Sequence, residues 1–481
     1  MGRLEFMVLR VQGAKLRFIF VFLALALFST VLATPAMVQG DGGDIEVVEG
    51  GAESQFPDGV RFYVTALSSE EIEEIRVFFT VIGRPGPSAY RILEFEPGNE
   101  VTGESLLRSA GGGAYIPPGT ELKYSFEVRD QSGAVFRTPD QEFVYSDNRF
   151  DWLTVSSGLI TVFYYGEYVE RRAQTVLDAA EDAFELMVPV LGIEPTEPLR
   201  IVSYNNYRDM SAALPFRAQA VRENLQTQGM AFTPERVLLV HGFDPTIRGT
   251  TSHEFVHLLV AEAAGQAYAR VPAWLNEGLA EYGNIDATED YSSALRYGIY
   301  TRRVKPLWYQ SSFGGTPDDI IIAYGQARSV VQYMISMYGE GSITELFTTL
   351  RDTLDIDLAM LEVYGVDQHG MDSLWRVAVG LEPLPPPAEL GSRLEDLQTA
   401  VPESASTPEP AAALESTPTP APTPAASLDE DQGQTSSGCN APVRGQSASP
   451  TGLASLLLLG APLALLYQRL GRWGPRRRRR R

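Results

Sequence analysis

Alternating apolar and polar residues mark the first part of the chain after residue 40. The stretches 60–64, 75–81 and 122–128 largely alternate in this way, which is typical of strands with one buried face. Turn-forming clusters such as residues 117–119 separate them. Short strands with turns between them predict an all-β domain over residues 41–150, and we expect an immunoglobulin-like sandwich.

From about residue 153 the pattern changes to helices mixed with short apolar strands. The helices are expected at residues 167–191, 326–338 and 343–350, and the strands at residues 199–204 and 236–240. The second of these strands precedes the most informative helix of the chain closely, as an edge strand beside a cleft would. These elements predict an α+β domain over residues 153–382.

The most informative helix contains the string HEFVH at residues 253–257. We expect Thr251 and Glu254 to form a capping box at its start, and Gly265 to end it. The residues around the motif are strongly apolar, so the helix should be buried and its histidines should face a protein interior or cleft.

This motif has the spacing of a metal site. His253 and His257 are four residues apart and therefore lie on one face of the helix, where two imidazoles can reach one zinc ion. Glu254 lies at the flank of that face, where it can take a proton from a metal-coordinated water. The chain has four histidines, and two of them fall in this one motif.

A second helix, predicted over the string WLNEGLAEY at residues 274–282, supplies further carboxylates. Catalytic zinc takes three protein ligands in many enzymes, and two histidines with a glutamate are one such set. Glu277 is the best third ligand. Glu281 lies one turn further on the same face, where it can accept a hydrogen bond from a ligand histidine.

The two motifs, HEFVH and WLNEGLAEY with 19 residues between His257 and Glu277, resemble the gluzincin zinc metallopeptidases. The similarity covers roughly residues 155–382 and is greatest to peptidase MA-like domains and the aminopeptidase N group, which implies a thermolysin-like catalytic domain. By this resemblance His253, His257 and Glu277 bind Zn²⁺ and Glu254 is the catalytic base.

The chain departs from aminopeptidase N-like enzymes at one place. Those enzymes carry a Gly-Ala-Met-Glu-Asn strand that binds the free amine of the substrate. The corresponding residues 227–232 read TQGMAF and hold no acidic residue, so we expect an endopeptidase acting on a peptide or protein substrate.

Related enzymes use a tyrosine downstream of the metal ligands to donate a hydrogen bond to the tetrahedral oxyanion. Tyr324, expected at the start of a helix, is our candidate for this catalytic role, and Tyr282 is the alternative.

The charge distribution and the two ends of the chain indicate where in the cell the protein is located. The net charge is −22 although residues 469–481 hold eight arginines, so the acidic body should not bind nucleic acid. We expect a signal peptide over residues 1–40 and a disordered stalk rich in Pro, Ala, Ser and Thr over residues 383–450. A transmembrane segment over residues 451–468 would precede a cytoplasmic tail.

These ends predict a single-pass cell-membrane protein with its catalytic domain outside the cytoplasm. The single cysteine, Cys439, lies just ahead of the apolar segment, which weakly resembles sorting tags that a membrane protease removes. The alternative is a plain tail anchor. One cysteine excludes an internal disulfide framework.

Two other functions fit the same residues. A non-catalytic surface adhesin with a zincin fold would need no base, so the intact Glu254 argues against it. A zinc enzyme that hydrolyses a non-peptide substrate would use the same ligands, since a fold and a site do not fix the substrate.

Overall fold

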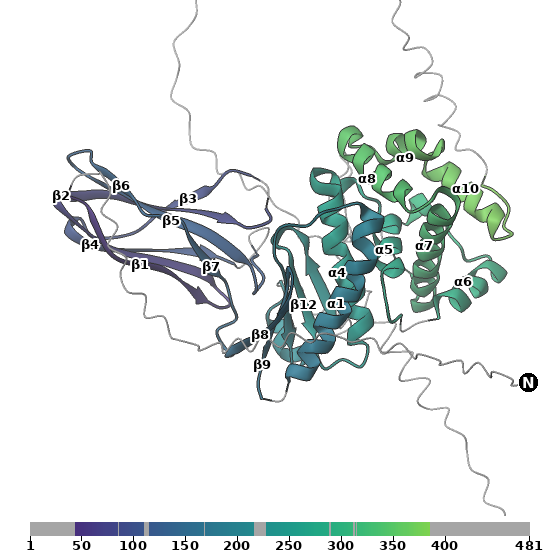
Figure 1. Cartoon of the computed structure of the whole chain (residues 1–481), viewed down its shortest axis with the longest axis horizontal. Helices are drawn as coiled ribbons and strands as arrows, with labels where there is room; N and C mark the ends of the chain where they lie inside the picture. Colours follow the sequence, from purple (N-terminus) through teal and green to yellow (C-terminus); the bar gives the residue numbers. More distant parts are fainter. Residues whose placement is uncertain are drawn as a thin grey trace, which may run out of the picture. The chain divides into compact units, whose positions relative to one another are not determined.

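The computed structural model describes residues 44–84, 86–109, 115–167, 169–215, 228–287, 290–310, 313 and 315–384 (Figure 1). The expected signal peptide, transmembrane segment, arginine tail and Cys439 lie outside these residues, as does all but the start of the expected stalk. Within them, a β-rich region precedes a mixed region whose later part is helical. The multidomain α and β organisation that the sequence predicts is therefore confirmed at this level.

The β-rich region holds seven strands in one sheet. They are β1 (Glu46–Gln55), β2 (Gly59–Val81), β3 (Ala89–Ile92), β4 (Gly98–Arg108), β5 (Glu121–Asp130), β6 (Val135–Arg137) and β7 (Gln141–Val144). The stretches 60–64 and 75–81, expected as two strands, belong to the single strand β2. Its first half pairs with β1 and β4, and its second half pairs with β3 and β5.

Alternation along β2 and β5 produces the core of this region. Val60, Phe62 and Val64 of β2 and Phe126 and Val128 of β5 are fully buried, because every second side chain of a strand points to the same face. The immunoglobulin-like topology that we expected remains a prediction.

A second sheet of five strands begins the region that carries the HEFVH motif. Its strands are β8 (Trp152–Ser157), β9 (Ile160–Tyr165), β10 (Leu199–Tyr204), β11 (Gly229–Phe232) and β12 (Val237–His241), in the order β11-β12-β10-β9-β8. Strands β9, β10 and β12 are parallel, and β8 and β11 run antiparallel at the two edges.

The strand expected over residues 199–204 is β10, with the same bounds. The strand expected over residues 236–240 is β12, but its prediction as an edge strand is wrong. It pairs with β10 on one side and with β11 on the other. The strand at that edge is β11, a segment of only four residues that is too short to stand out as a strand in the sequence.

The described helices follow and interleave with this sheet. They are α1 (Glu170–Leu191), α2 (Tyr207–Ala212), α4 (Ile247–Ala264), α5 (Ala273–Tyr282), α6 (Tyr291–Tyr300), α7 (Pro317–Tyr338), α8 (Gly341–Thr353), α9 (Ile356–Tyr364) and α10 (Gln368–Ala378). Three short 3₁₀ turns add η1 (Thr233–Glu235), η2 (Gly265–Arg270) and η3 (Leu307–Tyr309). Figure 1 shows α1 and α4 beside the five-stranded sheet, with α5 to α10 beyond them.

Helix α4 begins earlier than the sequence predicts. Its N-cap is Thr246 rather than Thr251, which lies inside the helix and is fully buried. The expected capping box is therefore wrong. The predicted end is confirmed, since Gly265 follows the helix with a φ of 52°, a backbone conformation that favours glycine.

Helix α7 also begins earlier than expected. Thr316 and Asp319 form a capping box in which each side chain bonds to the backbone of the other, and Pro317 occupies the first turn. Tyr324 consequently lies two turns inside the helix and not at its start. The helix ends at Tyr338, as predicted, and Gly339 follows it.

Close helix packing positions α5 between α4 and α7. Gly278 of α5 has no room for a side chain, because a Cβ there would stand 2.6 Å from the carbonyl oxygen of Ala327 in α7. Gly283, directly after α5, would likewise contact Val256 of α4 at 2.6 Å. These approaches bring the WLNEGLAEY helix against the HEFVH helix.

The predicted location in a membrane is contradicted. Over the ranges that the structure describes, no helix combines the length and the apolar character needed to cross a bilayer. We therefore correct the prediction of a single-pass membrane protein.

Candidate metal centre

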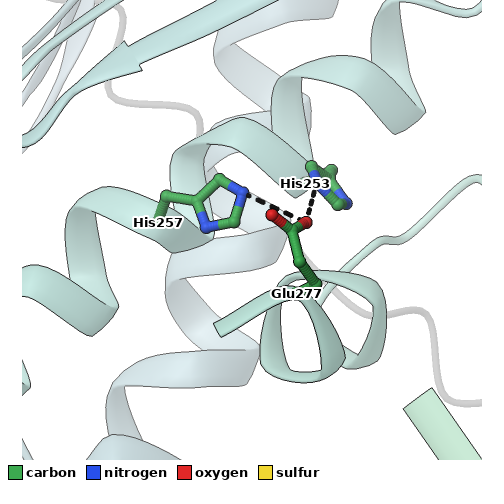
Figure 2. Close-up of side chains that lie close together, drawn as sticks. All are labelled: His253, His257 and Glu277. Carbon is green, nitrogen blue, oxygen red and sulfur yellow. Dashed lines mark ion pairs between the residues drawn. The ribbon is translucent and has the colours of Figure 1, made fainter. Parts of the chain in front are cut away.

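Two neighbouring helices bring three side chains together. His253 and His257 come from α4 and Glu277 comes from α5. One ligand atom from each lies within 4.8 Å of the others. Oε2 of Glu277 is 3.3 Å from Nε2 of His253 and 3.7 Å from Nε2 of His257. Figure 2 shows the two rings and the carboxylate pointing toward one another.

All three side chains are buried, so their electrostatic interactions are little screened by water. Burial by itself would lower the pKa of His253. The carboxylates of Glu281 and Glu277 outweigh that effect and raise the pKa of His253 well above its ordinary value of 6.5. The cluster therefore stabilises a positive charge at this place.

His253 has a second carboxylate on its other side. Nδ1 of His253 lies 2.9 Å from Oε1 of Glu281, while its Nε2 faces Glu277. The structure thus places Glu277 and Glu281, one turn apart on α5, at opposite nitrogens of the same imidazole. A carboxylate there selects the tautomer and the orientation of the ring.

His257 has a neutral counterpart that the sequence analysis missed. Nδ1 of His257 lies 3.0 Å from Oδ1 of Asn276, and the amide of Asn276 donates to the hydroxyl of Tyr268 at 3.2 Å. Asn276 directly precedes Glu277 in the WLNEG string. Adjacent residues of a helix point in directions about 100° apart, so the contact of Asn276 with His257 becomes apparent only once α5 packs against α4.

Glu254 lies beside this trio on α4 and is buried. The structure brings it against the edge strand β11, where a Cβ at Gly229 would stand 3.0 Å from Cγ of Glu254. Its carboxylate is not part of the group formed by His253, His257 and Glu277, so it is available for a role other than metal binding.

Tyr324 also lies at this site. Its ring is 6.0 Å from the ring of His253 and 4.8 Å from that of Phe313, measured between centroids, and the residue is buried. For Tyr282, the alternative, burial and the nearby charge of Glu340 raise the pKa of the hydroxyl. Of the two tyrosines, Tyr324 is the one in ring contact with a histidine of the cluster.

The side chains of this cluster can be compared with the protein ligands that zinc prefers. Two imidazole nitrogens and one carboxylate oxygen, converging from two helices and shielded from water, are the protein ligands of catalytic zinc sites with a His₂Glu set. A side-chain oxygen lies within 3.0 Å of the remaining nitrogen of each histidine, where metal-bound histidines almost always have a polar partner. The residues present therefore fit a zinc ion.

Comparisons with known proteins agree with this geometry. Residues 179–380, which include α4, α5 and α7, match the family description of the Peptidase MA superfamily. No curated protein matches the chain at the level required for significance.

Solved structures give weak overall similarity. Yeast LTA4 hydrolase in complex with bestatin is 12% identical, with 74% of this chain and 70% of that chain covered and a TM-score of 0.30. An M1 zinc metallopeptidase variant from Deinococcus radiodurans, bound to a Tyr-Ser-Ala substrate, is 11% identical, with 68% and 91% covered and a TM-score of 0.27. Aminopeptidase A of Legionella pneumophila is 12% identical, with 70% and 50% covered and a TM-score of 0.30.

At these TM-scores the solved structures support no argument about this chain. The family match and the side-chain geometry are independent of them. Both confirm the resemblance that the two motifs indicated. Residues 179–380 of this chain are similar to the Peptidase MA superfamily, the group of metallopeptidases that the two motifs resemble.

Proposed function

We propose that the chain is a zinc-dependent peptidase that hydrolyses peptide bonds, with His253, His257 and Glu277 as its metal ligands. The observation that carries the proposal is the convergence of these three buried side chains, with ligand atoms within 4.8 Å of one another. Zinc, when bound, polarises a carbonyl group and lowers the pKa of a coordinated water to about 7.

The protein's own residues divide the remaining work. Glu254 accepts the proton of the attacking water, because a carboxylate beside the metal ligands is a competent general base. It then has a proton to give to the leaving amine. Tyr324 donates a hydrogen bond to the oxygen of the tetrahedral intermediate. Both side chains are buried beside the cluster, so bulk water competes little with the proton transfer to Glu254 or with the hydrogen bond from Tyr324.

Glu281 and Asn276 keep the ligand histidines in place. Each lies against the Nδ1 atom of its histidine, at 2.9 Å for Glu281 and 3.0 Å for Asn276, which leaves both Nε2 atoms facing Glu277. With the rings held this way, the ligands are arranged before metal arrives, so less conformational entropy is lost on binding.

We further propose that cleavage is internal to the peptide chain. The edge strand β11 reads GMAF and holds no acidic side chain to bind a free amine. A substrate chosen by its amino terminus needs such a charge at the cleft, whereas an internal peptide bond does not.

The experiment that tests the function combines metal analysis with cleavage of a mixed peptide library. We expect one zinc per chain, hydrolysis that a chelator abolishes, and products cut within the peptides rather than one residue at a time from the amino end. Stoichiometric zinc without any hydrolysis would support the non-catalytic alternative. Cleavage of single amino-terminal residues would retain the peptidase function and refute the internal specificity.

A further inference from the structure

The two oxygens of Glu281 have different partners. Oε1, the oxygen 2.9 Å from Nδ1 of His253, accepts a hydrogen bond of 3.0 Å from the hydroxyl of Tyr291. Oε2 accepts one of 3.2 Å from the amide of Asn284. Glu281 is almost fully buried, and a buried carboxylate keeps its charge only where donors satisfy its lone pairs. The position of Oε1 therefore depends on Tyr291.

Helix packing fixes Tyr291 in this place. It is the first residue of α6, directly after the N-cap Asp290, whose side chain accepts from the backbone of Ser293. A Cβ at Gly325 of α7 would stand 2.6 Å from the carbonyl oxygen of Tyr291. The absence of a side chain at Gly325 thus allows the start of α6 to approach α7 closely, and the tyrosine hydroxyl reaches α5.

Tyr291 also lies beside the proposed oxyanion donor. Its ring centroid is 6.2 Å from that of Tyr324, and the Tyr324 ring is 6.0 Å from that of His253. Tyr291 therefore contacts both the carboxylate of Glu281, which lies against Nδ1 of His253, and the ring of Tyr324, which lies against the ring of His253. A change confined to the hydroxyl of Tyr291 would affect the first contact and leave the ring packing of the second intact.

The partners of His257 can be compared with those of His253. His257 is held by Asn276, and Asn276 in turn donates to Tyr268. Both histidines are thus supported by a polar side chain and then by a tyrosine. The partners differ in charge, because Asn276 is neutral and Glu281 is a carboxylate. Hydrogen bonds to a charged group are roughly twice as strong as those between neutral groups, so Tyr291 should matter more than Tyr268.

Building on the proposed zinc function, we propose that Tyr291 is a positioning residue of the metal centre, which holds Oε1 of Glu281 and through it the ring of His253. It touches neither the metal nor the substrate. Its effect is to keep Nε2 of His253 oriented toward Oε2 of Glu277.

The test measures zinc affinity by competition with a chelator, using the full chain carrying Tyr291→Phe. This change removes the hydroxyl and keeps the ring. We expect zinc to bind about tenfold more weakly, the lower end of the effect of losing such an outer partner. Tyr300→Phe, on the same helix at an exposed position, is the matched control and should leave the affinity unchanged. Tyr268→Phe should weaken it by less than Tyr291→Phe.

A second experiment, in a chain that already carries a change at Glu281, separates an effect of Tyr291 on the position of His253 from a general effect on the stability of the protein. In chains that already carry Glu281→Ala, Tyr291→Phe should change zinc affinity little further, because the carboxylate through which Tyr291 acts is already absent. A tenfold loss that persists in that background would overturn the proposal, as would an unchanged affinity for Tyr291→Phe alone. If His257→Ala abolishes zinc binding while Tyr291→Phe does not weaken it, only this inference fails. If the unmodified chain binds no zinc, the proposed function and this inference fail together.

Discussion

Gly229 of the edge strand β11 lies directly against Glu254 of α4. A Cβ atom at Gly229 would stand 3.0 Å from Cγ of Glu254 and 2.9 Å from Cγ2 of Thr250. Both distances are shorter than carbon atoms tolerate without movement. The strand therefore limits the space in which Glu254 can rotate, and the proposed base is held by the sheet as well as by its own helix.

This contact predicts the effect of Gly229→Ala. The added methyl group should displace the side chain of Glu254 and lower the rate of peptide hydrolysis, with zinc content unchanged because none of the three ligands touches the new atom. Rates on one peptide and zinc content would both be measured. Gly341→Ala is the control, since a Cβ at Gly341 meets no atom within 4 Å. Equal rates for the two variants would contradict the role given to this contact.

Glu254→Gln separates the base from the ligands. Glutamine keeps the shape but cannot accept a proton, so hydrolysis should fall about 100- to 10,000-fold while the chain still carries zinc. Glu277→Gln, one helix away, should instead lose zinc. The two variants would be compared by metal content and turnover in parallel. Turnover at the normal rate in Glu254→Gln would remove this residue from the mechanism.

Tyr324→Phe tests the proposed oxyanion donor. Loss of a single donor of this kind lowers kcat by about 100- to 1,000-fold. The ring remains, so its packing against Phe313 and the fold should be retained. We expect kcat to fall with little change in KM, because the oxyanion exists only in the transition state and the intermediate. Tyr282→Phe is the comparison and should keep a normal kcat.

Asn276→Ala tests the neutral partner of His257. Without the amide oxygen 3.0 Å from Nδ1 of His257, the ring loses the contact that fixes its tautomer. Zinc affinity should fall about 10- to 100-fold. Competition with a chelator measures this directly. An affinity equal to that of the unmodified chain would show that Asn276 only fills space.

Within each of the two helices, the sequence predicts which side chains share a face, because that spacing follows from helix geometry alone. His253 and His257 are one turn apart, and so are Glu277 and Glu281. The pairing of these two helices does not follow from spacing. It depends on Gly278 and Gly283, whose lack of side chains lets α5 approach α7 and α4. Asn276 and Tyr291 were missed because their roles appear only after that packing is known.

The bounds of the strands are also only partly predictable from the sequence. Strand β10 has the predicted bounds because its apolar run is short and isolated. Strand β2 was divided in the prediction because its centre, residues 68–74, is mostly polar. Pairing of Ile72 with both β4 and β5 nevertheless keeps this part of the chain extended, with a register shift on each side. The edge strand β11 has four residues and no pattern of its own. Its strand conformation comes from pairing with β12.

Asp319 provides a prediction about acid stability. Burial would raise the pKa of this carboxyl, but hydrogen bonds from Thr316 and the charge of Arg303 outweigh it and lower the pKa to about 2. The ordinary value is 3.8. A group whose pKa is lower in the folded state stabilises the fold above its unfolded pKa, and this contribution disappears as pH falls through the folded pKa.

We therefore expect Asp319→Asn to lower the free energy of unfolding at pH 7, because α7 loses its capping box and the partner of Arg303. The difference between the variant and the unmodified chain should shrink as the pH is lowered from about 4 toward 2, where the aspartate itself becomes protonated. Denaturant unfolding at several pH values measures both. Asp318→Asn, at the exposed neighbouring carboxylate, should show a much smaller difference at pH 7. A difference for Asp319→Asn that stays constant from pH 7 to pH 2 would mean that the carboxylate's charge contributes nothing and that only its shape supports the start of α7.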